Sequence, residues 1–389
     1  MEAAERRRSR RLLRTLYGAA LKGAGVDPEA AVVRALAGTD VRRALAGRRR
    51  VGLFAVGKAA AGMARAALRS FPRAPALVVV PRGDEARGLR GATVLRASHP
   101  EPDASSVRAA RRAVGFFTGF TAGDAIVCLI SGGSSSLLEH PRAGVSLAEL
   151  RRRVRALSDA GAPIGELNRL RTRLSRVKGG RLGRATRARL VTLVLSDVPG
   201  DRPGVVGSGP TVRSKRRADV VRVIGSNRDG LAAAAREARR LGLRPVVSPR
   251  RLSGEAPRAG RALARRAKEL PPGSVWLAGG ETVVRLRASR ARGGRSLELA
   301  LSAALALQTP GDAGVSLLAA GSDGRDGSSP AAGAFAGAST IARARRRGLD
   351  PGEALRRHAT HAFFERLGDL LVTGPTGTNV GDWVFLVKF

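Results

Sequence analysis

The sequence predicts an α/β protein built on a parallel β-sheet. Short apolar runs of strand-forming residues alternate along the chain with longer segments that carry helical spacing. Glycine-rich turns follow many of these runs, which is typical of strands that pass into crossover helices. The 389 residues are enough for two or three domains and a sizeable core.

The stretch Ala125–Leu138, AIVCLISGGSSSLL, is the main evidence for this prediction. It combines an apolar strand, a Gly-Gly-Ser-Ser-Ser turn and the start of a helix. Glycines let the main chain approach a ligand, and a helix N-terminus favours an anion. The hydroxyls of Ser134, Ser135 and Ser136 can cap that helix or bind phosphate oxygens. An ordinary capped turn is the alternative, since the turn matches neither a Walker A loop nor GxGxxG.

Further apolar runs predict strands on both sides of this stretch. In the first 250 residues they are Arg50–Val56, Ala76–Pro81, Ala92–Ser98, Leu190–Leu195, Val220–Ile224 and Pro245–Val247. Lys58 follows the first run directly after a glycine, where a cation suits a phosphate or a carboxylate. His99 lies between the third run and two prolines, and we expect it to shape a binding loop.

The segment from Ser146 to Arg189 is predicted to be helical, with breaks at Gly161, Pro163 and Gly179-Gly180. Four polar residues recur in it at three- and four-residue spacing and predict one polar helix face: Asn168, Arg171, Ser175 and Lys178. A solvated helix surface is the alternative interpretation. The glycine pair after Lys178 suggests a helix end held close to another group.

Two acids follow the run that ends at Leu195. Asp197 and Asp201 could hold Mg²⁺ through one or two carboxylates, which leaves other positions for phosphate and water. Gly207–Thr211 then forms a second loop of glycines and hydroxyls.

A change of composition over Ser248–Gly273, rich in Pro, Gly, Ser and Arg, predicts a domain boundary. Beyond it we expect strands at Val275–Ala278, Val283–Leu286, Val315–Ala320, Leu370–Val372 and a final strand ending at Phe389, with a helix over Ala354–Leu367. Glycine turns that carry Ser, Thr, Arg or Asp recur in both halves. They predict a ligand site built from many strand-end loops, suited to a polyanion and its metal.

Composition narrows the classes of function. Cys128 is the single cysteine, which argues against a disulfide framework or a thiolate metal site. The chain has neither a signal-peptide apolar region nor a run near the roughly 20 residues of a membrane span, so we expect a cytoplasmic protein. The net charge of +39 is spread along the chain, and aromatic residues make up only 3%. Nucleic-acid binding as the main function is therefore disfavoured.

Ten motifs in order resemble those of the glycerate 2-kinases with a MOFRL domain, some once named hydroxypyruvate reductases. They are AVGKAAAGM (55–63), SHPEPD (98–103), LISGGSSSLL (129–138), NRLRTRLSRVKGGRL (168–182), LSDVPGD (195–201), GSGPT (207–211), GGET (279–282), GGRSLELAL (293–301), GSDGRDG (321–327) and TGPTGTNVGD (373–382). The resemblance implies a Rossmann-like parallel-sheet domain over 1–250, a linker over 251–273, and a smaller α/β MOFRL domain over 274–389. It also implies an active site in the cleft between the domains.

The same resemblance implies phosphorylation of D-glycerate to 2-phosphoglycerate with ATP and Mg²⁺, and a homodimer is compatible with it. Lys58 and Arg295 would be cations on the substrate carboxylate or the transferring phosphoryl group. Asp197 would be the general base or a metal ligand, with Asp201 as a second metal ligand. The remaining binding residues would be Ser134, Ser135, Ser136, Asn168, Arg171, Lys178, Gly280, Glu281, Asp323, Thr376 and Asn379.

Three departures from the family pattern stand out. Ser296 and Leu297 replace Asn and Gln, Ser322 replaces Thr, and Arg357–His361 replaces an Asn-Asn-Asp-Ser-Tyr-like run. His358 and His361 could bind a metal, but a surface helix is the preferred interpretation. Two other functions stay open as alternatives, an NAD(P)-dependent hydroxypyruvate reductase and a basic nucleic-acid-binding protein. The reductase alternative is disfavoured because the chain lacks GxGxxG after its first predicted strand.

Overall fold

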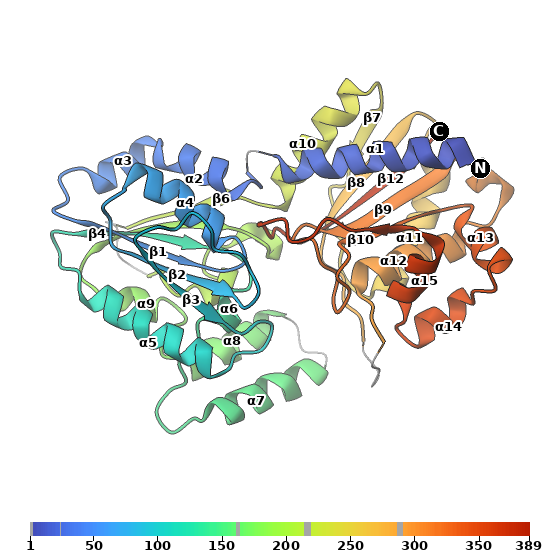
Figure 1. The fold of residues 1–389 in the computed structure, drawn as a ribbon. Helices are drawn as coiled ribbons and strands as arrows, with labels where there is room; N and C mark the ends of the chain where they lie inside the picture. The colour runs from blue at the N-terminus through green and yellow to red at the C-terminus, as the bar shows by residue number, and fades with distance from the viewer. Residues whose placement is uncertain (1–2, 24, 161–163, 214–218, 286–290) are drawn as a thin grey trace. The chain divides into compact units, whose positions relative to one another are not determined.

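The chain forms two compact units in a computed structural model that describes residues 3–23, 25–160, 164–213, 219–285 and 291–389. The parallel-sheet unit comprises Asp27–Ser226 and Gly377–Val380. The mixed-sheet unit comprises Met1–Val26, Asn227–Thr376 and Gly381–Phe389. Each unit is built on a six-stranded sheet of its own (Figure 1).

The sheet of the parallel-sheet unit has the order β3-β2-β1-β4-β5-β6, with every pair parallel. Its strands are β1 (Val51–Val56), β2 (Ala76–Pro81), β3 (Ala92–Ala97), β4 (Ala125–Ile130), β5 (Arg189–Leu195) and β6 (Val220–Gly225). These confirm the predicted α/β class and six predicted strands. The order reverses between β1 and β4, which is the switch point of a doubly wound sheet.

Helices cover both faces of this sheet. In Figure 1, α2 (Pro28–Leu36), α3 (Thr39–Leu45) and α4 (Ala60–Ser70) lie above it, and α5 (Ala104–Thr118) and α9 (Arg181–Arg184) lie below it. The remaining helices of the unit are α6 (Ser134–Leu137), α7 (Leu147–Asp159), α8 (Ile164–Leu174), η1 (Pro199–Asp201) and η2 (Val206–Ser208). Because both faces are covered, every residue of β4 is buried, including Cys128.

The mixed-sheet unit has the strand order β11-β10-β9-β12-β8-β7. Its strands are β7 (Arg244–Val247), β8 (Ser274–Gly280), β9 (Val315–Gly321), β10 (Gly333–Gly337), β11 (Leu370–Leu371) and β12 (Asp382–Lys388). Only β7 and β8 pair in parallel, and the other pairs are antiparallel. The predicted strand at 283–286 is wrong for its described part, since Val283 makes one bridge to Glu255 and Leu286 lies outside the described residues.

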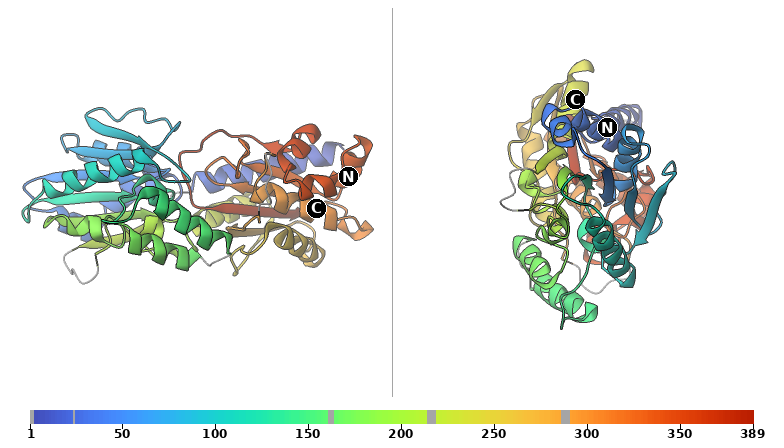
Figure 2. Two further views of the ribbon diagram at one scale, coloured as in Figure 1. Left: turned by 90° about the horizontal axis from the view of Figure 1, so that it is seen from below. Right: turned by 90° about the vertical axis from the view of Figure 1, so that its left-hand side faces the viewer.

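Helices α1 (Ala3–Leu21) and α10 (Asn227–Arg240) lie on one face of this sheet, and α11 (Ala256–Glu269) and α12 (Arg295–Ala306) lie on the other (Figure 1). Figure 2 shows the same helices in two further views, and α1 contacts the last strand, β12. The remaining helices of the unit are η3 (Pro310–Asp312), α13 (Thr340–Arg346), α14 (Pro351–Arg356) and α15 (Thr360–Leu367).

The compact units differ from the linear domains expected from the sequence. Strand β7 pairs with β8, and α10 packs against both, so the chain from Asn227 onward joins the second sheet. The expected linker, 251–273, contains α11, whose Leu263 and Ala267 belong to the buried core. Its abundant Arg residues serve the solvated side of an amphipathic helix, which composition alone does not distinguish from a linker.

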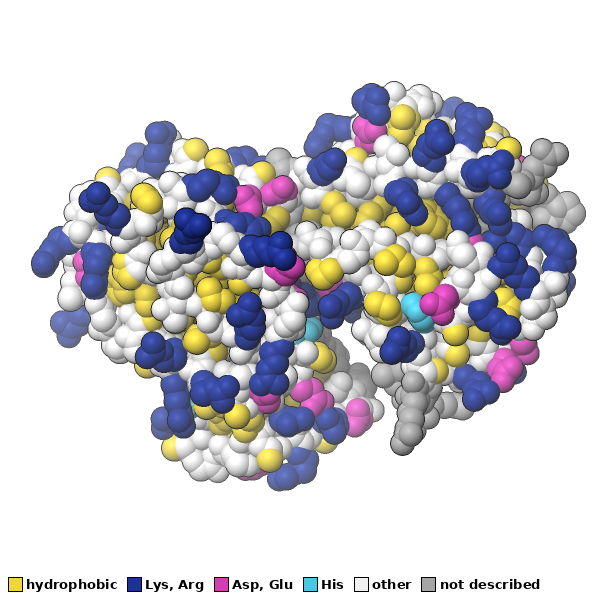
Figure 3. Space-filling view, viewed as in Figure 1, with side chains coloured by type: hydrophobic (Ala, Val, Ile, Leu, Met, Phe, Trp, Pro, Cys, Tyr) yellow, Lys and Arg dark blue, Asp and Glu magenta, His cyan; other side chains and the backbone are white. Residues whose placement is uncertain are grey.

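Charge is dispersed over the surface. Figure 3 shows Lys and Arg side chains scattered over the visible face of each unit, with Asp and Glu among them. Within the described ranges, no helix is both long enough and apolar enough to cross a membrane.

Candidate active site

The turns that follow β1 and β4 are joined by backbone hydrogen bonds at the switch point of the parallel sheet. The N–H of Lys58 donates to the carbonyl of Gly132 at 2.9 Å, and the N–H of Ser131 donates to that of Val56 at 3.0 Å. The Oγ atom of Ser131 also accepts from the N–H of Ala59 at 3.1 Å. Ligands of doubly wound sheets bind outside the carboxyl ends of the strands at this point.

Gly132 lies against two of the predicted site residues. A Cβ atom at this position would lie 2.1 Å from Oδ2 of Asp197 and 2.5 Å from Nδ2 of Asn379. That Nδ2 atom donates to Asp197 Oδ2 at 3.3 Å. Asp197 follows β5, and Asn379 belongs to the 377–380 segment that packs within this unit. Tertiary structure therefore brings together two side chains that lie far apart in the sequence.

Gly133 lies against two further side chains, those of Lys58 and His99. A Cβ atom here would lie 3.2 Å from Cγ of Lys58 and 3.2 Å from the ring of His99, and the residue has a φ of +83° that favours glycine. Lys58, His99, Asp197 and Asn379 thus surround the glycine pair. His99, which is expected to shape a binding loop, lies against this glycine turn.

The serine turn, Ser134–Ser136, is only one helical turn long, which limits the contribution of a helix dipole. Ser136 Oγ donates to the carbonyl of Gly133 at 3.0 Å, and Ser135 Oγ lies 3.2 Å from Ser208 Oγ. Ser134 Oγ is buried and has no hydrogen-bond partner in the described part of the chain. A buried hydroxyl without a partner is costly in free energy, which sets Ser134 apart from Ser135 and Ser136.

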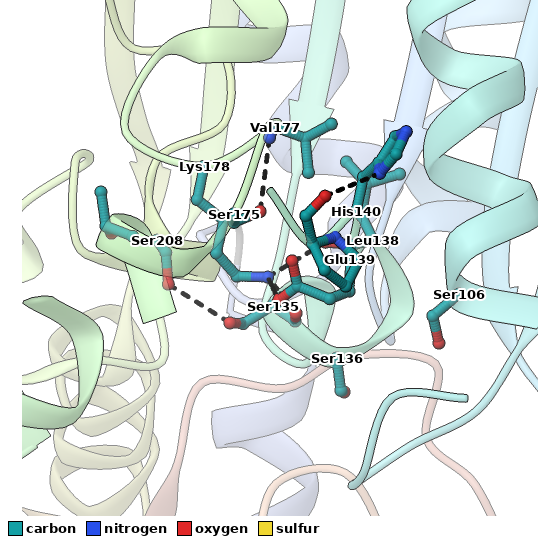
Figure 4. A network of polar contacts seen from close by, with 12 residues as sticks. Ser106, Ser135, Ser136, Leu138, Glu139, His140, Ser175, Val177, Lys178 and Ser208 are labelled. Atoms are coloured by element: carbon teal, nitrogen blue, oxygen red, sulfur yellow. Dashed lines mark hydrogen bonds and ion pairs between the residues drawn. The ribbon is translucent and has the colours of Figure 1, made fainter. Parts of the chain in front are cut away.

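The side chain of Lys178 points toward this turn, as Figure 4 shows. Its ammonium donates to the carbonyls of Ser135 at 2.7 Å and Leu138 at 3.1 Å, and to Glu139 Oε2 at 2.5 Å. Both side chains of the Lys178–Glu139 pair are 1% exposed. Burial lowers the pKa of Lys178, although Glu139 opposes that shift. An ammonium has three N–H donors, and all three are used here, so Lys178 supports the turn instead of contacting a ligand as expected.

The predicted polar face over 168–178 is wrong because the helix is shorter than its spacing suggests. Helix α8 ends at Leu174, Ser175 bridges to Pro141, and Lys178 lies in a turn. Only Asn168 and Arg171 remain on the helix. Arg171 is largely buried, which lowers the pKa of its guanidinium, while the charge of Glu139 opposes that shift.

The glycine pair at 179–180 holds another loop. The N–H of Gly179 donates to the carbonyl of Ser208 at 2.8 Å, and that of Gly180 donates to Gly209 at 2.7 Å. Both glycines have positive φ, of +60° and +74°. The expected close approach is therefore an approach to the 207–211 loop.

Asp197 and Asp201, the two acids expected to hold a cation, both follow β5. Ser196 Oγ donates to Asp201 Oδ1 at 2.8 Å, which fixes the orientation of the second carboxylate. The described residues contain no group of three or more His, Cys, Asp or Glu that could hold a metal. Mg²⁺ in phosphate-transfer sites needs only one or two carboxylates, because phosphates and water complete its coordination.

Arg295 is the centre of a second polar cluster, in the mixed-sheet unit. Its Nε and Nη2 atoms bind the two carboxylate oxygens of Asp382 at 2.6 and 3.0 Å, and Nη1 binds Glu281. Burial disfavours the charged guanidinium, but Asp382 and Glu281 outweigh it and raise the pKa of Arg295. Arg295, the cation expected on a substrate anion, is therefore paired with two acids of its own unit, and the Glu281 side chain remains 42% exposed.

Asp326 completes this cluster and was not among the sequence candidates. Its buried carboxylate accepts the N–H groups of Ser296 at 3.1 Å and Leu297 at 2.8 Å, at the start of α12. Burial and the charge of Asp382 raise the pKa of Asp326 to about 7. The signal available in the sequence was the second Asp of the GSDGRDG motif, which places a carboxylate in a glycine-rich turn.

The other candidates of the mixed-sheet unit shape turns. Thr376 donates its hydroxyl to the carbonyl of Ser322 and its N–H to that of Asp323 at 3.3 Å. Gly280 has a φ of +153° and lies against Leu252, where a Cβ atom would lie 2.2 Å from the carbonyl oxygen. The predicted set is thus divided between the two units, because Asn379 belongs to one and Thr376 to the other.

The two histidines of the divergent segment do not share a surface helix, so that expectation is wrong. The helical conformation is interrupted between α14 and α15, where His358 has a φ of +55°. His358 Nδ1 lies 2.7 Å from Glu298 Oε1, and the buried His361 lies 2.8 Å from Ser329 Oγ through its Nδ1. Each imidazole has its own polar partner, which leaves no arrangement for a shared metal among these residues.

Comparison with known proteins supports the resemblance seen in the motifs. Residues 12–240 match the family described as "Domain of unknown function (DUF4147)", and residues 274–382 match the MOFRL family. The glycerate 2-kinase of Pyrococcus horikoshii is 32% identical, with 96% of each chain covered. The chain belongs to the family of MOFRL-domain glycerate kinases. The D-glycerate 2-kinase of Thermotoga maritima is 36% identical over 86% of this chain and 90% of its own.

Other members of the family agree in fold and differ in name. The crystal structure of glycerate kinase from Thermotoga maritima aligns with a TM-score of 0.81 at 33% identity, covering 97% of this chain and 98% of its own. A protein of Agrobacterium vitis named "Putative hydroxypyruvate reductase" is 37% identical, with 96% of this chain and 93% of its own covered. The fold described above is thus shared with the glycerate kinase of Thermotoga maritima.

Proposed function

We propose that this chain is an ATP-dependent glycerate 2-kinase that phosphorylates D-glycerate at its 2-hydroxyl. Membership of the MOFRL-domain glycerate kinases supports this proposal. The observation that carries it is the convergence of Lys58, Asp197 and Asn379 on Gly132 and Gly133, at the switch point of a Rossmann-like sheet.

In the proposed reaction, the 2-hydroxyl oxygen of glycerate attacks the γ-phosphorus of ATP. The bond from that phosphorus to the β–γ bridging oxygen breaks, ADP leaves, and the hydroxyl proton passes to the carboxylate of Asp197. The Lys58 ammonium stabilises negative charge on the transferring phosphoryl group or on the substrate carboxylate. Phosphoryl transfer needs mainly positioning and charge stabilisation, which a cation and a base on adjoining strand ends provide.

The serine turn and the acids complete the proposed site. The backbone of Gly132 and Gly133 and the hydroxyls of Ser134 and Ser135 would bind nucleotide phosphates. Asp197 and Asp201 would hold Mg²⁺, which when bound neutralises phosphate charge. In the mixed-sheet unit, Arg295 would bind an anionic group that takes the place of the exposed Glu281 carboxylate.

The test measures ADP release from ATP and Mg²⁺ with D-glycerate. We expect turnover in the wild type, and Lys58→Ala and Arg295→Ala to lower kcat/KM by about 10²-fold or more. Arg152→Ala, an exposed arginine on α7, is the control. ³¹P NMR of the product distinguishes the 2- from the 3-phosphate.

The result that would overturn the proposal is no turnover with D-glycerate or any other hydroxy acid while the protein is folded. Oxidation of NADH or NADPH by hydroxypyruvate would support a reductase instead. The turn after β1 argues against a reductase because it lacks the glycines of a dinucleotide-binding loop.

A further inference from the structure

Three arginines line a hollow on the parallel-sheet unit that plays no part in the proposed reaction. The hollow has a volume of about 350 Å³ and is lined by Arg142, Ala143, Arg176 and Arg181. This volume lies within the range of roughly 300–1,000 Å³ that is typical of small-molecule sites. Its lining contains no carboxylate.

The backbone that carries these arginines is fixed. The N–H of Arg142 donates to the carbonyl of Leu174 at 2.9 Å, and the N–H of Arg176 donates to that of His140 at 2.7 Å. Between them, Pro141 and Ser175 form an antiparallel bridge. The guanidinium groups therefore extend from two paired segments, and a ligand that binds them would not have to order the backbone.

The positive charge of the hollow is not neutralised. Within the described residues, neither Arg142 nor Arg176 forms an ion pair. Arg181 donates from Nη1 to the carbonyls of Thr172, Ser175 and Lys178, and its Nε and Nη2 atoms make no hydrogen bond in the same part of the chain. The carboxylate three residues before Arg142, that of Glu139, is already paired with Lys178.

Two titratable groups report this excess of positive charge. Burial and the neighbouring charges of Arg142 and Arg184 lower the pKa of Arg181. Burial also lowers the pKa of His140, where Arg176 and Arg111 act in the same direction against a hydrogen bond to Pro141 and the charge of Glu139. An anion in the hollow would relieve repulsion among these cations.

We propose that Arg142, Arg176 and Arg181 form a binding site for a small polyanion, either a phosphorylated or a polycarboxylic compound. A guanidinium presents its donors in a planar fork that matches two oxygens of a phosphate or a carboxylate. Arg181, held by three carbonyls, supplies a fixed donor, and Arg142 and Arg176 supply further donors from the paired segments.

Isothermal titration calorimetry of the full chain with inorganic pyrophosphate and, separately, with citrate tests this site. The variant Arg142→Gln/Arg176→Gln removes two positive charges from the hollow. The matched control Arg108→Gln/Arg152→Gln removes two from the exposed surfaces of α5 and α7 in the same unit. We expect the hollow variant to bind at least about tenfold more weakly and the control to bind like the wild type, since the loss of a hydrogen bond to a charged group is expected to cost about a factor of ten or more.

The Lys58→Ala variant separates this site from the proposed nucleotide site, which could also accept pyrophosphate. We expect it to retain the binding that the hollow variant loses. Binding of pyrophosphate alone assigns a phosphorylated ligand, and binding of citrate alone assigns a polycarboxylic one. The proposal is overturned if neither probe binds, if the hollow variant binds like the wild type, or if only Lys58→Ala loses binding. Circular dichroism establishes that each variant is folded, and the single variants Arg142→Gln and Arg176→Gln replace the double variant if it is not.

Discussion

The two units contain ion-pair centres of opposite design. In the parallel-sheet unit, one cation meets one acid, since Lys178 is paired with Glu139 and both are fully buried. In the mixed-sheet unit, Arg295 is paired with Asp382 and Glu281. The buried carboxylate of Asp326 interacts electrostatically with Asp382 and Arg295. Counted by direct ion pairs, the first centre has one cation and one acid, and the second has one cation and two acids.

This difference determines what each centre can do. The balanced pair also donates to two carbonyls of the serine turn, so its donors are consumed by structure. The acid-rich cluster has one carboxylate, Glu281, that is 42% exposed, and a second, Asp326, whose pKa is raised to about 7. A charged residue in a sequence motif is therefore fully buried in its ion pair in one unit and belongs to a partly exposed cluster in the other.

The largest expected effect comes from breaking the balanced pair. Glu139→Ala would leave the Lys178 ammonium buried without a counter-charge, and we expect a loss of about 3–5 kcal/mol in the free energy of unfolding. Urea denaturation followed by circular dichroism measures it. A loss below about 1 kcal/mol would contradict the structural role of the pair.

The double variant Glu139→Leu/Lys178→Met is its control. Replacing both charges with apolar side chains removes the desolvation cost, so most of the lost stability should return. Recovery would be incomplete because the carbonyls of Ser135 and Leu138 lose their donor.

The second prediction concerns the glycine pair of the candidate site. In Gly132→Ala, the new methyl group would displace Asp197 and Asn379, and we expect kcat/KM for the proposed reaction to fall about 100-fold. Gly115→Ala on α5 adds the same methyl group where no atom lies within 4 Å. Equal activity of the two variants would show that Gly132 is not close to the chemistry.

The third prediction tests the acid-rich cluster through pH. Folded Asp326 keeps its proton up to about pH 7, whereas in the unfolded chain its carboxyl group loses the proton near the ordinary pKa of 3.8. The folded state therefore binds more protons over this range, and stability falls as pH rises, by up to about 1.4 kcal/mol per pH unit. In Asp326→Asn, the free energy of unfolding, measured by urea denaturation, should not show this fall between pH 4 and 7. Parallel pH profiles of the two proteins would refute the assignment.

The smallest expected effect is at the surface. Glu101 pairs with Arg151 and Arg155, and these side chains are all more than 40% exposed. Water and salt screen such pairs, so Glu101→Gln should change the free energy of unfolding by less than about 1 kcal/mol. A larger loss in the same urea experiment would mean that ion pairs in this arginine-rich chain stabilise it more than exposed pairs usually do.

Much of the parallel-sheet unit could be predicted from local pattern. Strands β1, β2 and β4 are covered by helices on both faces, so each is a nearly continuous apolar run bounded by turn residues. Lys58 and Asp197 could be chosen as site residues because they follow such runs. The pairing of Lys178 with Glu139 could not be predicted, because the two residues lie 39 positions apart and the intervening segment looked helical.

Strand β10, GAFAG, shows why other parts escaped prediction. It has no β-branched residue, and its glycines lie against the neighbouring strand, where a Cβ atom on Gly333 would lie 1.9 Å from the carbonyl oxygen of Ala319. Its sequence is therefore selected by close packing of backbones and not by strand propensity. In the same way, α1 and α10 join the second sheet through packing that no local pattern reveals.

By itself, the sequence determined the α/β class, the parallel strands and the family, because apolar periodicity and ordered motifs are local properties of the chain. Tertiary structure decided which charged side chains are held in ion pairs and which are left to bind a ligand. It buried Lys178 on Glu139, paired Arg295 with Asp382, and left Arg142 and Arg176 without an ion pair among the described residues. The reason is physical: the state of a charged side chain depends on its desolvation and on the charges near it in space, and neither quantity is written in its sequence neighbours.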